Sequence, residues 1–136
     1  MSFPYCISIN SSYIYEQSTD ERINQNDAAI TLAHELGHYL GLRHVFSEGG
    51  TTSMCTDTDY CKDTPSYNRS EYEQWLNNLD KQNKYQLKDL AKRYSCEKGE
   101  YEAHNIMDYA YCFYNEITLE QRKRIRHILN LSLIHI

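Results

Sequence analysis

Residues 34–44 read HELGHYLGLRH, and this stretch is the most informative one for the fold and the site of the chain. His34 and His38 are four positions apart, so on a helix they lie on one face and can direct both imidazoles at one metal ion. Glu35 is offset from His34 by about 100° around the helix axis, which places its carboxylate beside such an ion rather than on it. The spacing therefore predicts an active-site helix that presents two metal ligands and one nearby carboxylate.

Gly41 and His44 complete the pattern H-E-x-x-H-x-x-G-x-x-H. Gly41 is expected to end the helix in the left-handed conformation that glycine adopts at little cost, so that the chain reverses and His44 reaches the same ion from a loop. Three histidine ligands leave one coordination position of a zinc ion open, which is typical of a catalytic zinc. Because zinc lowers the pKa of a bound water to about 7, Glu35 is predicted to be the general base that takes a proton from this water as it attacks a carbonyl. The alternative, unrelated surface histidines and an ordinary helix-ending glycine, would require five matching positions to coincide by chance.

Two further motifs follow downstream: residues 63–65 read DTP and residues 105–109 read NIMDY. With these, the chain resembles the metzincin metallopeptidases, whose extended zinc motif is followed by a methionine-containing turn beneath the metal. Within that clan it is most similar to the pappalysin/cytophagalysin family. The similarity is best over residues 28–65 and 104–127.

The resemblance gives roles to two residues of the last motif. It implies that Met107 forms the hydrophobic floor under the three histidines. It also implies that the Tyr109 hydroxyl stabilises the tetrahedral oxyanion and approaches the zinc when substrate is absent. Taken alone, Met107 could fill an ordinary gap in the core, and Tyr109 is one of thirteen tyrosines. Their coupling to the upstream motif favours the functional interpretation.

The resemblance also predicts an α+β fold, a metzincin-like zincin catalytic domain over residues 1–130. This domain is expected to be mostly helical, with an active-site helix, a Met turn and a C-terminal helix. Residues 1–41 would be the end of the upper subdomain, and residues 42–130 the lower subdomain. Family members have several strands of a twisted sheet before the active-site helix, one of them an edge that aligns extended substrate. Residues 1–27 suffice for only the final strand, so we expect a domain truncated at its N-terminal sheet.

The last six residues of the chain, 131–136, read LSLIHI. They resemble the translation of an adapter used in DNA library preparation, so we expect them to be a sequencing artefact and His135 to have no role. Together with the short N-terminal region, they indicate a fragment of a larger secreted or cell-surface enzyme.

Hydrophobic periodicity and capping residues predict the secondary structure. Residues 5–15 alternate loosely, which indicates one or two short strands, and residues 45–68 and 95–116 are expected to be loops. Helices are expected from Ala28 to Gly41, over residues 70–81 and 84–94, and from residue 118 onwards, with capping patterns at Ser70–Glu73 and Thr118–Gln121. The residues expected to face inward are Ile30, Leu32, Ala33, Leu36 and Leu40 on the first helix, Tyr85, Leu87, Leu90 and Ala91 on the third, and Ile125, Ile128 and Leu129 on the last.

Length and composition limit the classes of function. The 136 residues leave room for one domain, and the net charge of −5 without a basic stripe argues against nucleic-acid binding. The short basic run at residues 122–126 is interpreted as a solvated helix face. No apolar run is long enough for a membrane span. The sequence leaves the oligomeric state open.

Five cysteines raise the question of disulfides: Cys6, Cys55, Cys61, Cys96 and Cys112. Cys55 and Cys61 lack the close spacing of a zinc knuckle, and disulfides are expected if the protein is exported. The resemblance suggests that cysteines near residues 63–65 and near the Met turn are cross-linked, and we favour Cys61–Cys96. The partner of Cys112 stays open, and the odd number leaves one thiol unpaired.

Asp57, Asp59 and Asp63 form an acidic cluster after the zinc motif. Some members of the family that the chain resembles bind calcium there, and oxygen ligands at alternate positions suit that ion. We favour a solvated acidic loop with Asx turns, and calcium remains the alternative.

Two functions are compatible with the sequence. The favoured one is a zinc-dependent endopeptidase for peptide or protein substrates, in which His34, His38 and His44 hold one zinc ion, Glu35 activates water and Tyr109 stabilises the oxyanion. The alternative is a noncatalytic zinc-binding or recognition fragment with an incomplete substrate cleft. Glu35 favours the first, because a site that only binds zinc does not need a general base.

Overall fold

The computed structural model describes residues 7, 28–47, 59–79, 85–95, 97–109 and 111–133. These residues contain four helices and a two-stranded antiparallel sheet, a mixture consistent with the predicted α+β class, although these two strands were not among the predicted ones. In chain order the elements are α2 (Ala28–Tyr39), α3 (Arg69–Asn78), α4 (Leu87–Leu90), β1 (Lys92–Ser95), β2 (Gly99–Glu102) and α5 (Leu119–Leu133). The strands predicted over residues 5–15 fall, apart from Ile7, outside the described residues.

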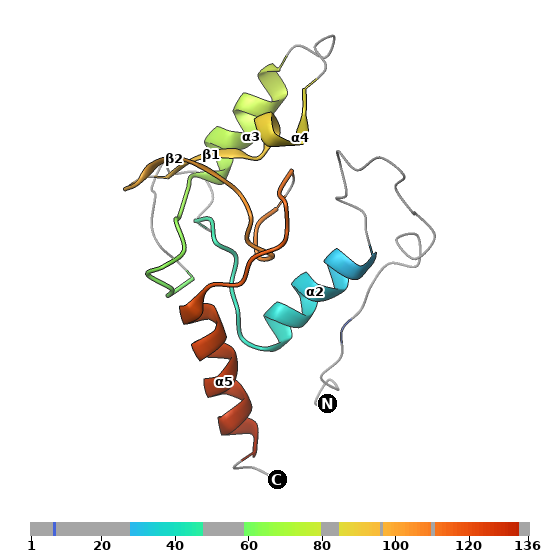
Figure 1. Cartoon of the computed structure of the whole chain (residues 1–136), viewed down its shortest axis with the longest axis vertical. Coiled ribbons are helices and arrows are strands. Elements are labelled where there is room, and N and C mark those ends of the chain that lie inside the picture. The colour runs from blue at the N-terminus through green and yellow to red at the C-terminus, as the bar shows by residue number, and fades with distance from the viewer. Residues whose placement is uncertain are drawn as a thin grey trace.

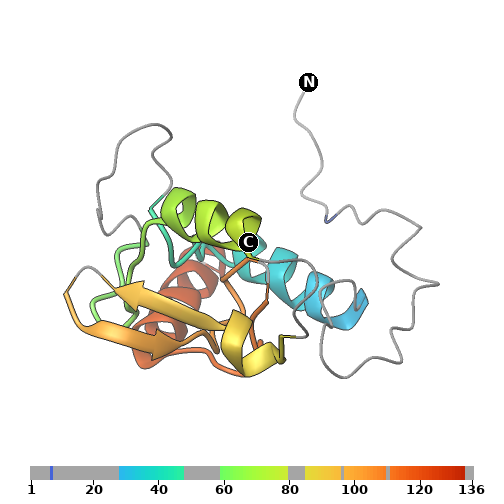
Figure 2. The ribbon, with the colours of Figure 1, turned by 90° about the horizontal axis from the view of Figure 1, so that it is seen from above.

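The elements fall into two groups around a shared core. Figure 1 shows α2 and α5 in one half of the molecule, and α3, α4 and the β1–β2 hairpin in the other, with the chain between β2 and α5 passing between them. Seen from above, α3 runs alongside the hairpin (Figure 2). The core is formed by the segment after α2, by α3 and the residues just before it, and by the segment after β2. Its buried residues are Leu42, Val45, Phe46, Tyr67, Tyr72 and Met107.

The helix α2 ends as its glycine predicts. Gly41 has a φ of 86°, in the left-handed region. The backbone N–H of Leu42 donates to the carbonyl of Gly37 and that of Gly41 donates to His38, both at 2.9 Å. These two bonds form a Schellman motif, which satisfies the last carbonyls of the helix and reverses the chain.

The buried face of α2 differs from the predicted one. Leu32 and Leu36 are 47% and 43% exposed, whereas His34 and Gly37 are buried. Leu32 lies two positions before His34, so it points about 200° away around the helix. A helix that turns its histidines inward therefore exposes these leucines, and this part of the prediction was wrong.

The helix α3 begins earlier than predicted. Its N-cap is Asn68, whose side-chain oxygen accepts a hydrogen bond from the backbone N–H of Glu71 at 3.3 Å. Ser70 lies inside the helix, so the Ser70–Glu73 capping pattern is not the helix start. Asparagine is among the strongest N-cap residues. Asn68, two positions before Ser70, therefore serves as the N-cap that was predicted for the serine.

The helix predicted over residues 84–94 is much shorter than expected among the described residues of that range. Only Leu87–Leu90 are helical there, and the chain then forms β1, in which Arg93 pairs with Tyr101 of β2. The alternating burial along β1 buries Arg93 and exposes Tyr94. Contacts with distant residues, described below, therefore override the local helical pattern. The loop predicted over residues 95–116 contains β2 as well.

The helix α5 starts at the predicted capping pattern. The Gln121 N–H donates to the Thr118 hydroxyl at 3.3 Å, and the Thr118 N–H donates to the Gln121 side-chain oxygen at 3.0 Å. Ile125 packs against the core, whereas Leu129 is 45% exposed, so the inward face was predicted correctly for the first and wrongly for the second.

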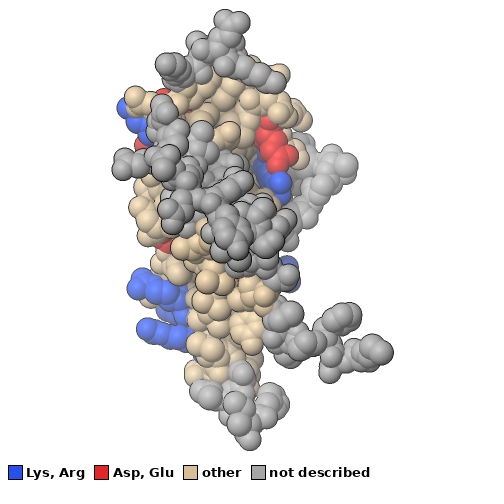
Figure 3. Space-filling model, turned by 90° about the vertical axis from the view of Figure 1, so that its right-hand side faces the viewer, with Lys and Arg blue, Asp and Glu red and all other residues tan. Residues whose placement is uncertain are grey.

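The face of the molecule drawn in Figure 3 carries a group of Lys and Arg side chains at the height of α5. On α5 itself, Arg122, Lys123 and Arg126 are exposed, in keeping with a solvated basic face. No helix among the described residues is long and apolar enough to cross a membrane.

The described cysteines correct the disulfide prediction. Cys61 and Cys112 are buried free thiols, so the Cys61–Cys96 bridge is not formed. Burial raises the pKa of Cys61 to about 11 and that of Cys112 to about 12, so both stay protonated at neutral pH. Cys6, Cys55 and Cys96 lie outside the described residues.

Two aspartates of the acidic cluster after the zinc motif accept hydrogen bonds from different parts of the chain. Asp59 is buried and accepts hydrogen bonds from the Cys61 N–H and the Thr64 hydroxyl. Asp63 accepts from the Thr118 hydroxyl and the Glu120 N–H, which ties this loop to the start of α5. Asp57 lies outside the described residues, and calcium binding stays a prediction.

Candidate active site

Three histidines meet at the C-terminal half of α2. His34 and His38 lie one turn apart on the helix, and His44 returns to them from the loop that Gly41 opens. Their Nε2 atoms are mutually 3.0–3.2 Å apart. Within the described part of the chain, they are the one group of His, Cys, Asp or Glu side chains that could hold a metal ion.

Backbone carbonyls fix the protons of two of these rings. Nδ1 of His34 lies 2.7 Å from the Ile106 carbonyl oxygen, and Nδ1 of His38 lies 3.0 Å from that of Leu42. A carbonyl oxygen only accepts, so each Nδ1 carries the proton and each neutral ring presents a lone pair at Nε2. Burial lowers the pKa of His34, which favours its neutral form. Two lone pairs 3.1 Å apart repel each other unless a cation lies between them.

The triad fits zinc in both geometry and chemistry. A tetrahedral zinc with Zn–N bonds of about 2.0–2.1 Å would hold its nitrogens roughly 3.3–3.4 Å apart, close to the observed separations. Imidazole nitrogen is a preferred zinc ligand, and carbonyls that accept from the other ring nitrogen orient such ligands. His34, His38 and His44 could therefore hold one zinc ion and leave further positions for water or substrate.

Glu35 lies on α2 next to His34 and is half-buried. Its position on the helix is offset from the two histidines, as the motif requires. The structure thus places a carboxylate on the ligand-bearing helix that is not itself a member of the ligand group.

Aromatic rings form a wall beside the histidines. The Tyr109 ring centroid lies 4.3 Å from that of His44 and 5.3 Å from that of His34. Phe46 stacks on His44 at 4.7 Å with the ring planes 12° apart. Tyr109 is 37% exposed, so the wall is open to solvent on one side.

Met107 lies in a turn directly against α2. It is fully buried, and a Cβ built on Gly37 would be 2.5 Å from its sulfur. The glycine in the helix therefore makes room for the methionine. The turn is tied in place because Val45 N–H donates to the Met107 carbonyl, and Met107 N–H donates to the Asn105 side chain at 3.0 Å.

The Asn105 side chain is also held by α5. Its side-chain amide exchanges two hydrogen bonds with that of Gln121, at 2.8 and 3.0 Å. Gln121 is 1% exposed and also caps α5 through Thr118. One buried glutamine thus couples the start of α5 to the turn that contains Met107.

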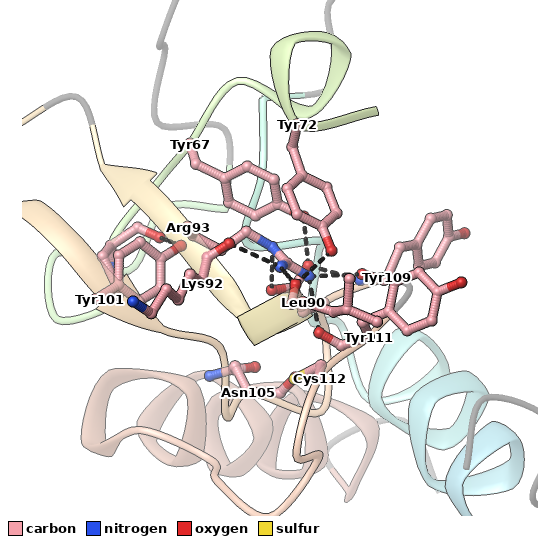
Figure 4. Close-up of polar contacts among 12 residues, drawn as sticks. Tyr67, Tyr72, Leu90, Lys92, Arg93, Tyr101, Asn105, Tyr109, Tyr111 and Cys112 are labelled. Carbon is pink, nitrogen blue, oxygen red and sulfur yellow. Dashed lines mark hydrogen bonds and ion pairs between the residues drawn. The ribbon is translucent and has the colours of Figure 1, made fainter. Parts of the chain in front are cut away.

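A buried ionic network, absent from the sequence predictions, fixes the backbone of Tyr109. Asp108 accepts hydrogen bonds from the Tyr67 hydroxyl at 2.5 Å and from the Tyr109 N–H at 2.7 Å. Arg93 lies 3.6 Å from the other carboxylate oxygen, and its Nη2 donates to the carbonyls of Tyr109 and Tyr111, both at 3.2 Å. Figure 4 shows the hydrogen bonds of the Arg93 guanidinium as dashed lines to Leu90, Tyr109 and Tyr111.

The network excludes water almost completely. Arg93, Asp108 and Tyr67 are 1–2% exposed, and the guanidinium lies 3.6 Å from the ring centroid of Tyr72. Burial raises the pKa of Asp108, and the charge of Arg93 opposes this rise. In the sequence, only the aspartate next to Met107 indicated part of this network. Nothing in the sequence indicated that Arg93 is its partner.

Comparison with known proteins is consistent with this geometry. Residues 5–130 match the profile of peptidase family M43, described as pregnancy-associated plasma protein-A. The chain belongs to this family. This confirms the resemblance to pappalysins, and the matched segment of this M43 chain contains the histidine triad, Met107 and Tyr109.

The M43 chain is also similar to curated fungal proteins. It is 37% identical over 108 residues to proteins named extracellular metalloprotease from Arthroderma benhamiae and from Trichophyton verrucosum. A third protein of that name, from Arthroderma otae, shows the same identity. In each case the alignment covers 77% of this chain, and the chain spans about a third of the relatives' length. No solved structure matches the chain significantly.

Proposed function

We propose that this chain carries the catalytic centre of a metzincin-type, zinc-dependent endopeptidase that cleaves peptides or proteins outside the cell. The observation that carries the proposal is the convergence of three Nε2 atoms, two of them with lone pairs fixed toward the centre by backbone carbonyls. The relatives named extracellular metalloprotease support secretion.

Zinc, when bound by His34, His38 and His44, would supply Lewis-acid chemistry for water and the substrate carbonyl. Glu35 lies beside this centre on α2 and would take the proton of the attacking water and return it to the departing amine. Tyr109 would donate its hydroxyl hydrogen to the oxyanion, because its ring packs on two of the ligands.

The remaining residues of the site would position these groups. Met107 would serve as the floor of a Met turn, because it is fully buried against α2. Arg93 and Asp108 would hold the backbone of Tyr109 in place. A noncatalytic zinc-binding role is less well supported, since Glu35 accompanies the ligands on the same helix.

The test is peptide cleavage by the zinc-loaded chain. Cleavage is expected to stop when zinc is chelated and to return when zinc is restored. Glu35→Ala should lower the rate by at least about 100-fold, the usual contribution of a general base, while the bound zinc stays at one ion per chain. Glu97→Ala, at an exposed position between β1 and β2, is the matched control and should cleave like the original protein.

Equal cleavage by the Glu35→Ala and original proteins would contradict the proposed mechanism. Zinc binding without cleavage by either protein would favour the noncatalytic alternative instead.

A further inference from the structure

Arg69, the first residue of α3, extends over the aromatic wall of the metal site. Its guanidinium carbon lies 4.7 Å from the ring centroid of Tyr109 and 5.0 Å from that of Phe46. Both rings pack on His44. A permanent positive charge therefore lies one ring away from the metal ligands.

Most of the hydrogen-bonding capacity of Arg69 is unused. Its Nε donates to the Glu73 carboxylate at 2.6 Å, and the two side chains are 40% and 50% exposed. No other residue in the described ranges accepts a hydrogen bond from Arg69, so within those ranges the four N–H groups on its terminal nitrogens have no acceptor.

Two carboxylates lie near the Arg69 guanidinium, and the Arg69 side chain is still 40% exposed. Asp108 is 2% exposed and is engaged by Arg93, Tyr67 and the Tyr109 N–H. Glu73 lies one helical turn further along α3, and such an exposed i,i+4 pair contributes little to stability. Among the described residues, neither carboxylate accepts a hydrogen bond from the terminal nitrogens of Arg69. Burial raises the pKa of Asp108, and the charge of Arg69 is among those that oppose this rise.

We propose that Arg69 determines specificity by binding a carboxylate of the peptide substrate close to the scissile bond. The proposal rests on the proposed peptidase function. The planar guanidinium presents parallel N–H groups that match a carboxylate in a bidentate pair, which an ammonium group cannot do. The guanidinium carbon lies over the rings of Tyr109 and Phe46, and both rings pack on His44, so these contacts hold the guanidinium near the histidines.

The carboxylate has two chemical sources: an acidic side chain within the substrate, or the C-terminal α-carboxylate of a peptide. The first would make the enzyme select acidic sequences. The second would make it remove short segments from the C-terminus.

The test measures binding rather than turnover. The zinc-loaded Glu35→Ala protein is titrated with labelled alanine-based peptides that contain a single Glu, Gln or Lys at successive positions, each with a free or an amidated C-terminus. Fluorescence anisotropy reports the affinity. A preference of about fivefold or more for Glu over Gln is expected for a side-chain carboxylate, and for free over amidated ends if the terminus is recognised.

Substitutions of Arg69 in the same background identify the responsible group. Arg69→Gln should abolish the preference, Arg69→Lys should keep only part of it, and Arg69→Glu should shift the preference to the Lys peptide. Lys123→Gln, which removes an exposed positive charge from α5, is the matched control and should leave the preference unchanged. One bound zinc per chain in every variant shows that the site is intact.

Equal affinity for the Glu, Gln, free-acid and amide peptides, or no binding of any peptide, would overturn the assignment of Arg69. So would a preference that persists in Arg69→Gln. If the carboxylate preference depends on Arg69 but the zinc-loaded protein with Glu35 intact cleaves no peptide, the peptidase function would be contradicted and the binding site would stand.

Discussion

At the scale of single residues, the site depends on close approach between α2 and the turn at Met107. A Cβ on Gly37 would lie 2.5 Å from the Met107 sulfur, and one on Gly41 would lie 2.8 Å from Ile128. These two glycines bring two distant segments against the helix that bears the histidines. Gly41 also needs its positive φ, whereas Gly37 is helical and needs only the space.

Gly37→Ala is expected to destabilise the protein although alanine is the better helix former. Replacing glycine by alanine inside an exposed helix usually adds about 0.5–1 kcal/mol of stability. Here the added methyl group meets Met107, so we expect a loss of about 1–3 kcal/mol in the free energy of unfolding, measured by urea denaturation.

The matched test of this explanation is the double variant Gly37→Ala/Met107→Ala. Shortening Met107 removes the clash, so the double variant should lose less stability than the sum of the two single variants. Additive losses would show that the space below Gly37 is not the cause.

At the scale of elements, two predictions test places where the observed secondary structure differs from the one expected from the sequence. The first concerns the start of α3. Asn68→Ala should cost about 1 kcal/mol, because Asn68 is the N-cap. Ser70→Ala should change the free energy of unfolding by less than about 0.5 kcal/mol, because Ser70 is an exposed residue inside the helix. A larger loss from Ser70→Ala would mean that the helix starts at the serine.

The second concerns the strand β1. Arg93→Met would leave the Asp108 carboxylate buried without its cation, so we expect a loss of about 3–5 kcal/mol in the free energy of unfolding. Lys92→Met, one position earlier and half exposed, removes the same charge and should cost less than about 1 kcal/mol. Similar losses in the two variants would show that the buried pair with Asp108 does not stabilise the protein.

At the scale of the whole molecule, the metal is expected to join α2 to the loop that follows it. Zinc is expected to bind only the folded arrangement of His34, His38 and His44. At a free zinc concentration 100 times its Kd, it should therefore add about 2.7 kcal/mol to the free energy of unfolding. For a chain of 136 residues we expect a rise in Tm of roughly 9 °C, measured by calorimetry with and without chelator.

The control for zinc stabilisation is His44→Ala, which keeps both helix ligands and removes the one from the loop. Most of the zinc-dependent rise in Tm should disappear in this variant. An unchanged rise would place the stabilising zinc elsewhere in the protein.

The sequence by itself determined the features that depend on local geometry. The spacing of His34 and His38 follows from the period of a helix, the turn at Gly41 from the freedom of glycine, and the start of α5 from the reciprocal bonds of Thr118 and Gln121. Each of these involves residues close together in the chain, so a short window of sequence was enough.

Only the tertiary structure decided the features that depend on distant partners. Arg93 is buried in a strand because Asp108 and the carbonyls of Tyr109 and Tyr111 compensate its charge, and a local pattern cannot reveal such partners. The position of Arg69 over Tyr109 likewise depends on contact between residues 40 positions apart. Burying a charge is favourable only where opposite charge and hydrogen-bond acceptors converge, and their convergence is a property of the folded molecule.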